Sequence, residues 1–411
     1  MQEKYQLSIV VLLLLSFGIQ AKVTPLSPEN GSMFETLTDE QIAVFGGETR
    51  TNRLRTVTKL KESAPKEAWQ RQRPLVLKWK ATEGESEPWR VRLSTKSDFS
   101  DGRDMWLDRR ELAQEPIDDG KSVLWTCNVP LANLELGKTY YWEVWSDVKC
   151  REFRCGFTYP NGCKCGKAKP GKVSPVFSFT TTDRAPRWIS LEGRTDNVRD
   201  VGGWRTVDGS RVRTGLVYRG TAFNDNSVAG LNRGRNRLTV EDVRYLTEEL
   251  GIKTDLDLRS PRELAGMRES PLGSKVKFVN VISQSYQGLF TDVGKDAMAR
   301  NFRVFCDRVN YPIYFHCIHG VDRTGSLAYV LNGLLGVDKE DLERDWEAAT
   351  YPKLSGVRNP WSERACAHYD RGFAKYGREG DSLAERIRLY LLDCGITQGE
   401  IDSFKAIMLV K

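Results

Sequence analysis

The sequence predicts a multidomain protein in which an all-β sandwich precedes an α/β domain with a central, mostly parallel sheet flanked by helices. Two patterns support this fold class. Between residues 73 and 183, short runs of alternating apolar and polar residues are separated by Gly, Asp, Asn and Pro, which is typical of antiparallel strands. From residue 188 to 411, strand-like runs alternate with helix-length segments, which favours a parallel sheet.

The first 21 residues predict a signal peptide. They have a polar start with Lys4, an apolar run from Leu7 to about Phe17 and a cleavage site after Ala21. A retained membrane anchor is the alternative, but the run is shorter than the roughly 20 apolar residues that cross a bilayer. We therefore expect a secreted or periplasmic protein with no stable membrane span.

Residues 22–72 are interpreted as an extended N-terminal extension with a short helix near Thr38 to Phe45. Little chemistry is apparent in this stretch. Over the whole chain 62 Lys and Arg are interspersed with 55 Asp and Glu, for a net charge of +7. This modest excess does not favour a nucleic-acid partner, but it suits anionic substrates.

The sandwich is predicted from five strand-like runs: LVLKWK, WRVRLS, SVLWTCNV, YYWEVW and VFSFTT. In the fourth run, period-two alternation places one set of aromatic side chains on a core face. The phrases LANLELGKTYYWEVW and SPVFSFTT resemble a fibronectin type III module. The resemblance implies either a spacer or a surface that contacts a protein or glycan.

Four of the nine cysteines cluster in one Gly- and Pro-containing loop of the sandwich, namely Cys150, Cys155, Cys163 and Cys165. In an exported protein they predict two local disulfides. A zinc site is the alternative, but the Cys-x-Cys end is not a usual zinc-ligand spacing.

The α/β domain is predicted from residue 188 onward. Thr239 caps a helix that ends at Gly251. Three strands are expected at 254–258, 277–282 and 312–317, and a buried apolar helix at 326–335. Further helices are expected at 338–349, 361–376, 381–393 and 397–409.

The stretch HCIHGVDRTG (316–325) places Cys317 at the end of the third strand and Arg323 six positions later, just before the buried helix. A strand, tight loop and helix of this kind form a phosphate cradle, since backbone N–H groups and the helix N-terminus point at one anion. Arg323 adds a bidentate contact to two phosphate oxygens. The predicted phosphate-binding residues are Ile318, His319, Gly320, Val321, Asp322 and Arg323.

The same groups favour the thiolate of Cys317, whose pKa they lower. In-line attack on a phosphate ester would form a phosphocysteine intermediate that water hydrolyses. Thr324 is expected to hydrogen-bond the sulfur and help it leave. We expect His316 to support the loop, and we expect no metal or other cofactor.

With these motifs in view, HCIHGVDRTG resembles the His-Cys-x5-Arg signature of protein tyrosine and dual-specificity phosphatases. The segments NVRDVGGWRT (197–206), GLVYRGT (215–221) and GIKTDLDLRSPRE (251–263) extend the resemblance to a bacterial group of tyrosine phosphatases. It implies a tyrosine-phosphatase fold and dephosphorylation of phosphotyrosine, and in some members of phosphoserine, phosphothreonine or phosphoinositides. Phosphoinositide-active members commonly carry Lys where this chain has Val321, which favours phosphotyrosine or another single phosphate ester.

The general acid that protonates the leaving group has three candidates. Asp257 ends the TDLDL strand, Asp322 lies inside the cradle, and Asp292 lies in the loop after KFVNVI. Each also has a structural interpretation, such as pairing of Asp257 with Arg259. Two arginines in the matching segments, Arg199 and Arg219, either border the anion or form structural ion pairs.

Two alternatives remain open. A phosphatase for inositol phosphates or other small phosphometabolites would use an identical loop. An extracellular binding protein could use the sandwich for recognition and the loop only to hold phosphate. The first interpretation, a metal-independent phosphatase acting on phosphotyrosine, is the one that the motifs favour.

Overall fold

The computed structural model describes residues 23–47, 49–60, 69–82, 89–107, 112–117, 122–129, 131–146, 171–172, 174–193, 195–223, 238–264, 266–349 and 363–410. The predicted signal peptide and the four clustered cysteines lie outside these ranges. The chain forms two compact units. Unit 1 comprises Met1–Ser32, Val76–Asn128 and Thr139–Phe179, and unit 2 comprises Met33–Leu75, Val129–Lys138 and Thr180–Lys411.

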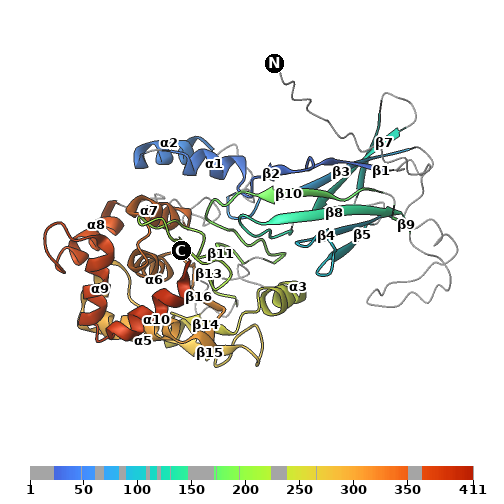
Figure 1. The fold of residues 1–411 in the computed structure, drawn as a ribbon. Coiled ribbons are helices and arrows are strands. Elements are labelled where there is room, and N and C mark those ends of the chain that lie inside the picture. Colours follow the sequence, from blue (N-terminus) through green and yellow to red (C-terminus); the bar gives the residue numbers. More distant parts are fainter. Residues whose placement is uncertain are drawn as a thin grey trace, which may run out of the picture. The chain divides into compact units, whose positions relative to one another are not determined.

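Unit 1 is rich in strands, which form two sheets (Figure 1). One sheet has the order β1-β3-β7-β6 and the other β2-β10-β8-β4-β5, with β9 beside β8. The strands are β1 (Val23–Ser27), β2 (Ser32–Phe34), β3 (Leu75–Thr82), β4 (Trp89–Ser94), β5 (Arg103–Leu107), β6 (Leu112–Pro116), β7 (Ser122–Val129), β8 (Thr139–Ser146), β9 (Gly171–Lys172) and β10 (Phe177–Thr181). The five expected runs are all strands.

Alternation along β8 explains how this unit is packed. Tyr140, Trp142 and Val144 are buried, as the period of two requires for residues on one face of a strand. Glu143, on the other face, is buried as well, and its carboxylate accepts a hydrogen bond from Trp145 Nε1 at 2.7 Å. The predicted core face of this strand is therefore confirmed.

Unit 2 contains a five-stranded sheet of order β11-β13-β16-β14-β15. Its strands are β11 (Arg199–Asp200), β13 (Val217–Thr221), β14 (Thr254–Asp257), β15 (Lys277–Asn280) and β16 (Ile313–Cys317). The pairs of β13 with β16, β14 with β16 and β14 with β15 are parallel, and β11 is an antiparallel edge. The expected parallel sheet is present. A separate pair joins β12 (Arg211–Val212) and β17 (Leu409–Val410) antiparallel.

Helices surround this sheet. They are α3 (Val240–Arg244), the π-helix η4 (Tyr245–Glu249), α4 (Pro261–Leu264), the 3-10 helices η5 (Tyr286–Phe290) and η6 (Arg308–Asn310), α5 (Asp292–Cys306), α6 (Asp322–Leu334), α7 (Lys339–Ala348), α8 (Glu363–Phe373), α9 (Leu383–Asp393) and α10 (Gln398–Met408). Thr239 caps α3, as predicted, and it forms a capping box with Asp242. The buried helix α6 begins at Asp322, four positions before the expected start, because the cradle feeds into it directly.

The N-terminal extension contributes two helices to unit 2, α1 (Asp39–Phe45) and α2 (Arg50–Leu60). Thr38 caps α1 in a capping box with Gln41. Apolar residues of both helices join Trp69, Trp188 and Ala348 in one buried cluster. The extension is thus packed among α/β residues that follow it much later in the sequence. Among the described residues, no helix combines the length and apolar character needed to cross a bilayer.

Candidate active site

The predicted cradle lies at the carboxyl end of the central strand β16. The parallel register places Thr221 of β13 opposite Cys317, and Asp257 of β14 opposite His316. Cys317 is only 3% exposed. Ligands of parallel α/β sheets bind at the carboxyl ends of the strands. The sheet therefore brings Cys317 and two neighbouring strand ends to one edge.

Gly320 is required at the turn of the loop. Its φ is +65°, a value that glycine adopts readily and that L-residues other than Asn rarely adopt. A Cβ at this position would collide with the carbonyl oxygen of Gly220 and lie 3.0 Å from Nδ2 of Asn197. The loop therefore packs against β13 more closely than any side chain at position 320 would allow.

Three successive carbonyl groups of the loop are bound by groups outside it. The Ile318 carbonyl accepts from the backbone N–H of Ala222 at 3.2 Å. Asn197 Nδ2 donates to the carbonyls of His319 and Gly320 at 3.3 and 3.0 Å, and Arg219 Nη2 also donates to that of Gly320, at 2.9 Å. Because these carbonyls face away from the cradle, the peptide N–H groups are free to face into it.

Helix α6 follows the loop and begins without a side-chain cap at Val321. The N-terminal N–H groups of an uncapped helix carry partial positive charge and suit an anion. Val321 itself is 3% exposed. The position where related phosphoinositide-active proteins commonly carry Lys is therefore occupied here by a buried apolar side chain.

Glu263, at the end of the matched segment 251–263, holds Arg323. Its Oε2 and Oε1 accept hydrogen bonds from Arg323 Nη1 and Nη2 at 2.7 and 2.8 Å. Despite partial burial, these bonds lower the pKa of Glu263 to about 2. The sequence analysis assigned no role to Glu263. The signal that could have found it is its position shortly after a strand, in the segment 251–263 that resembles the phosphatase family.

This pairing leaves one edge of the guanidinium available. Arg323 Nη1 also donates to the Leu258 carbonyl at 3.3 Å, so both of its protons are engaged. Within the described part of the chain, the hydrogen bonds of Arg323 use Nη1 and one Nη2 proton, and none is made by Nε or the second Nη2 proton. These two donors form a fork that matches two oxygens of a phosphate.

The environment of Cys317 favours its thiolate. Burial opposes ionisation, but the positive charge of Arg323 and the nearby hydroxyl and backbone N–H of Thr324 outweigh it and lower the pKa of Cys317. Among the described residues the buried Thr324 hydroxyl has no hydrogen-bond partner of ordinary geometry. The hydrogen bond from Thr324 to the sulfur therefore stays a prediction.

His316 lies behind the loop. Its Nε2 is 3.0 Å from Asp255 Oδ1 and 3.8 Å from Asp257 Oδ2. Burial disfavours the imidazolium, but these two carboxylates prevail and raise the pKa of His316. The supporting position that the sequence suggested for His316 agrees with these contacts.

The three candidate acids occupy different environments. Asp257 is fully buried, and Arg259 binds both of its oxygens at 2.6 to 3.0 Å. Although burial opposes it, His316 and Arg259 lower the pKa of Asp257, so this carboxyl holds no proton at neutral pH. Asp292 is exposed at the start of α5.

Asp322 is the first residue of α6, inside the cradle and half-buried. It accepts a hydrogen bond from the Tyr286 hydroxyl, and its charge acts on the Cys317 thiol. Of the three candidates, Asp322 therefore interacts both with Cys317 and with a neighbouring aromatic side chain.

Arg199 and Arg219 form a buried network with Asp345 of α7. Arg199 Nε donates to Asp345 Oδ1 at 2.8 Å, and Arg219 Nη1 donates to Oδ2 at 2.6 Å. Burial and the neighbouring Arg199 lower the pKa of Arg219 to about 10, so it stays charged at neutral pH. Two cations face one carboxylate, and Arg219 also contacts the loop.

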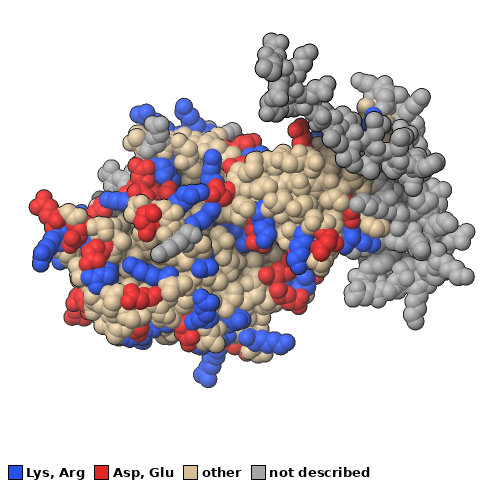
Figure 2. All heavy atoms as spheres, in the orientation of Figure 1, with Lys and Arg blue, Asp and Glu red and all other residues tan. Residues whose placement is uncertain are grey.

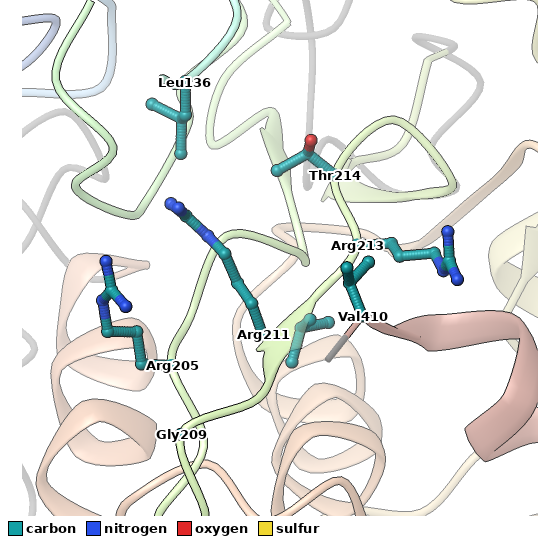
Figure 3. A pocket seen from close by; sticks show the side chains of 8 residues that line it. Leu136, Arg205, Gly209, Arg211, Arg213, Thr214 and Val410 are labelled. Atoms are coloured by element: carbon teal, nitrogen blue, oxygen red, sulfur yellow. The ribbon is translucent and has the colours of Figure 1, made fainter. Parts of the chain in front are cut away.

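Two hollows described in unit 2 are lined by residues outside the loop. One of about 390 Å³ is lined by Arg205, Arg211 and Arg213 beside β12 and β17 (Figure 3). Asp183 binds two of these arginines, at 2.7 and 2.9 Å. Within the described ranges, no group of three or more His, Cys, Asp or Glu is placed to hold a metal ion.

Comparison with known proteins agrees with this geometry. Residues 189–376 match the model of the family described as "Tyrosine phosphatase family". This segment is a tyrosine phosphatase family domain. The match contains every predicted catalytic residue of the loop and the three candidate acids, and it supports a phosphoric monoester hydrolase.

A protein of Cupriavidus necator, named "Putative tyrosine-protein phosphatase", is 27% identical to this chain over 190 residues. The alignment spans 39% of this chain and 64% of that relative. Two structures of the catalytic core of Siw14, named in one as a PP-IP phosphatase from S. cerevisiae, are 16% identical. They cover 36% and 40% of this chain and 80% and 81% of theirs, with TM-scores of 0.25 and 0.27. The family assignment does not depend on these low scores.

Proposed function

We propose that this protein is a metal-independent phosphatase that hydrolyses phosphate monoesters, with phosphotyrosine in proteins as its substrate. The observation that supports this best is the buried Cys317, whose pKa the positive charge of Arg323 lowers. A thiolate, a fork of donors and an uncapped helix N-terminus together suit a tetrahedral dianion.

In the proposed reaction, the Cys317 thiolate attacks phosphorus, a sulfur–phosphorus bond forms and the ester oxygen leaves. Asp322 gives its proton to that oxygen. The transferred phosphoryl group is held by the loop N–H groups and by Arg323. Water then attacks the phosphocysteine, Asp322 takes a proton from the water, and inorganic phosphate leaves as the thiolate returns.

Phosphotyrosine is preferred because of the depth of the sulfur. With Cys317 only 3% exposed, the phosphate must be carried at the end of a long group, and a phenol ring reaches further than the short side chain of phosphoserine. Tyr286, which hydrogen-bonds Asp322, belongs to an aromatic cluster with Trp346, His368 and Tyr369. Trp346 and Tyr369 are buried, so the partly exposed rings of Tyr286 and His368 are the surface that we propose for an aromatic substrate.

Two further proposals concern the rest of the chain. The strand order of unit 1, with β1-β3-β7-β6 in one sheet, is that of an immunoglobulin-like ABED sheet, which supports a fibronectin III-like module. The leader-like first 21 residues support export of the protein.

On the face drawn in Figure 2, basic and acidic side chains of the described residues are intermixed.

The deciding experiment compares hydrolysis of p-nitrophenyl phosphate by the full-length protein and by Cys317→Ser, with a chelator present. We expect activity in the wild type and none in the variant. A panel of peptides with phosphotyrosine, phosphoserine and phosphothreonine, together with inositol phosphates, then tests the substrate class. Activity that survives the substitution refutes the mechanism, and a preference for inositol phosphates refutes the substrate assignment alone.

A further inference from the structure

The N-terminal extension, which lies outside the family match, contacts the residues that hold the phosphate-binding loop. Gln70 precedes β3 and is 4% exposed. Its Oε1 accepts a hydrogen bond from the backbone N–H of Asn197 at 3.2 Å. Asn197 is fully buried and is the residue whose side chain binds the His319 and Gly320 carbonyls.

The backbone of Asn197 explains why this contact matters. Its φ is +60°, in the left-handed region that non-glycine residues adopt at a cost. A hydrogen bond from its N–H to Gln70 helps to hold that conformation. The conformation in turn aims the Asn197 amide at the loop, so Gln70 acts on the loop through one intermediate residue.

A second contact reaches the loop through α7. Arg53 of α2 is 2% exposed, and its Nε and Nη2 donate to Glu347 at 2.7 and 3.1 Å, across 294 positions of sequence. Its Nη2 is also 4.0 Å from Glu343. Figure 1 shows α2 beside α7, in agreement with these contacts.

The geometry of α7 links Arg53 to the cradle. Glu343 and Glu347 are one turn apart and share a face, whereas Asp345 is two positions from each and points to the opposite side. On that side Asp345 binds Arg199 and Arg219. Helix α7 is therefore fixed between Arg53 and the two arginines, of which Arg219 holds the Gly320 carbonyl.

We propose that Gln70 and Arg53 are positioning residues for the phosphate-binding loop, and that the catalytic domain includes the extension from residue 33 to 75. This inference rests on the proposed function. Gln70 acts through Asn197, and Arg53 acts through α7 and Asp345. The extension thereby supports both sides of Gly320, since the Gly320 carbonyl accepts from Asn197 and from Arg219.

The test uses the full-length protein and three variants. Gln70→Met keeps the shape but removes the acceptor, which leaves the buried Asn197 N–H unpaired and is expected to lower stability. The Gln70 Nε2 that it also removes is buried without a partner among the described residues, so the loss of that group adds little to the cost. Arg53→Met removes the ion pair with Glu347. Asn52→Ala, an exposed change on the same helix, is the matched control.

Two readouts report on the loop without turnover. The first is the pH dependence of Cys317 alkylation by iodoacetamide, followed on the Cys317 peptide by mass spectrometry. The second is the orthovanadate concentration that protects Cys317. We expect both positioning variants to shift alkylation to higher pH and to need about tenfold more orthovanadate, as loss of one buried hydrogen bond implies. Asn52→Ala should match the wild type.

Variants that lower the unfolding temperature but leave both readouts unchanged would show a purely structural role and overturn the proposal. If Arg53→Met does not fold, Arg53→Lys is measured instead, because it keeps one contact to Glu347, and the expected shifts are smaller but have the same direction. A wild-type Cys317 that titrates as an ordinary thiol without orthovanadate protection refutes the proposed function and the positioning roles together.

Discussion

Glu263 accepts hydrogen bonds from both terminal nitrogens of Arg323, at 2.7 and 2.8 Å. The carboxylate thus fixes the plane of the guanidinium and leaves the Nε edge for phosphate. This relationship assigns a role to a residue outside the loop and leads to the first prediction.

Glu263→Gln should weaken the hold on Arg323, because a neutral amide offers one acceptor where the carboxylate offers two. We expect kcat/KM for p-nitrophenyl phosphate to fall by about tenfold, which corresponds to about 1.4 kcal/mol for a weakened charge-assisted pair. Steady-state kinetics measure this. Glu269→Gln, in the loop before β15, is the control, and an equal loss in both variants would contradict the assignment.

The Glu263 pair also has a defined pH dependence. Because the folded pKa is lowered from 4.5 to about 2, the pair contributes stability above pH 4.5 and loses it as pH falls toward 2. Denaturant unfolding between pH 2 and 6 should show a steeper acid loss in the wild type than in Glu263→Gln. Parallel curves for the two proteins would refute the contribution.

For the general acid, Asp322→Asn should remove the basic limb of the kcat/KM pH profile, and neither Asp257→Asn nor Asp292→Asn should do so. The loss should be larger for phenyl phosphate than for p-nitrophenyl phosphate, because p-nitrophenolate leaves without help from an acid. Asp257→Asn should instead reduce stability by about 3 kcal/mol, since it leaves Arg259 buried without its carboxylate. An unchanged profile in Asp322→Asn excludes it as the acid.

Asp345→Asn should destabilise the protein by about 3 to 5 kcal/mol, because two buried arginines lose their shared carboxylate. Burial opposes ionisation of Asp345, but Arg199 and Arg219 lower its pKa. The network therefore stabilises the fold above the ordinary Asp pKa and is lost as pH falls through the lowered value. Urea unfolding at pH 7 measures this loss of stability. An Asp345→Asn variant with the same unfolding midpoint as the wild type would contradict the prediction.

Gly320→Ala should abolish protection of Cys317 by orthovanadate, because the added Cβ collides with the Gly220 carbonyl at a φ of +65°. Gly209 also has positive φ, +85°, but nothing lies within 4 Å of its Cβ position. Gly209→Ala should therefore cost only about 1 kcal/mol in stability and preserve the protection. Equal effects of the two changes would mean that the close packing on β13 is unimportant.

Local features were predictable from the sequence. The three predicted strands of the sheet, the helix cap of Thr239, and the strand, loop and helix around Cys317 all depend on residues close together in the chain. One of the three strands, β15, lies at an edge of the sheet and not in its centre. Their signals are periodicity, capping chemistry and a short motif. The candidate acids were named in the same way, with Asp257 and Asp322 ranked equally ahead of Asp292, and the sequence could not decide between the first two.

The sequence by itself determined which residues carry the proposed chemistry, Cys317 and Arg323, because loop geometry and residue type are local properties. Only the tertiary structure decided what holds them: Glu263 on Arg323, Asp345 on Arg219, and Gln70 and Arg53 behind the loop. These contacts join residues up to 294 positions apart in the sequence. The local sequence around a polar residue does not show which distant residue it will pair with. Burial makes such pairings obligatory, because a buried polar group without a partner is costly, but burial itself is known only once the chain has folded.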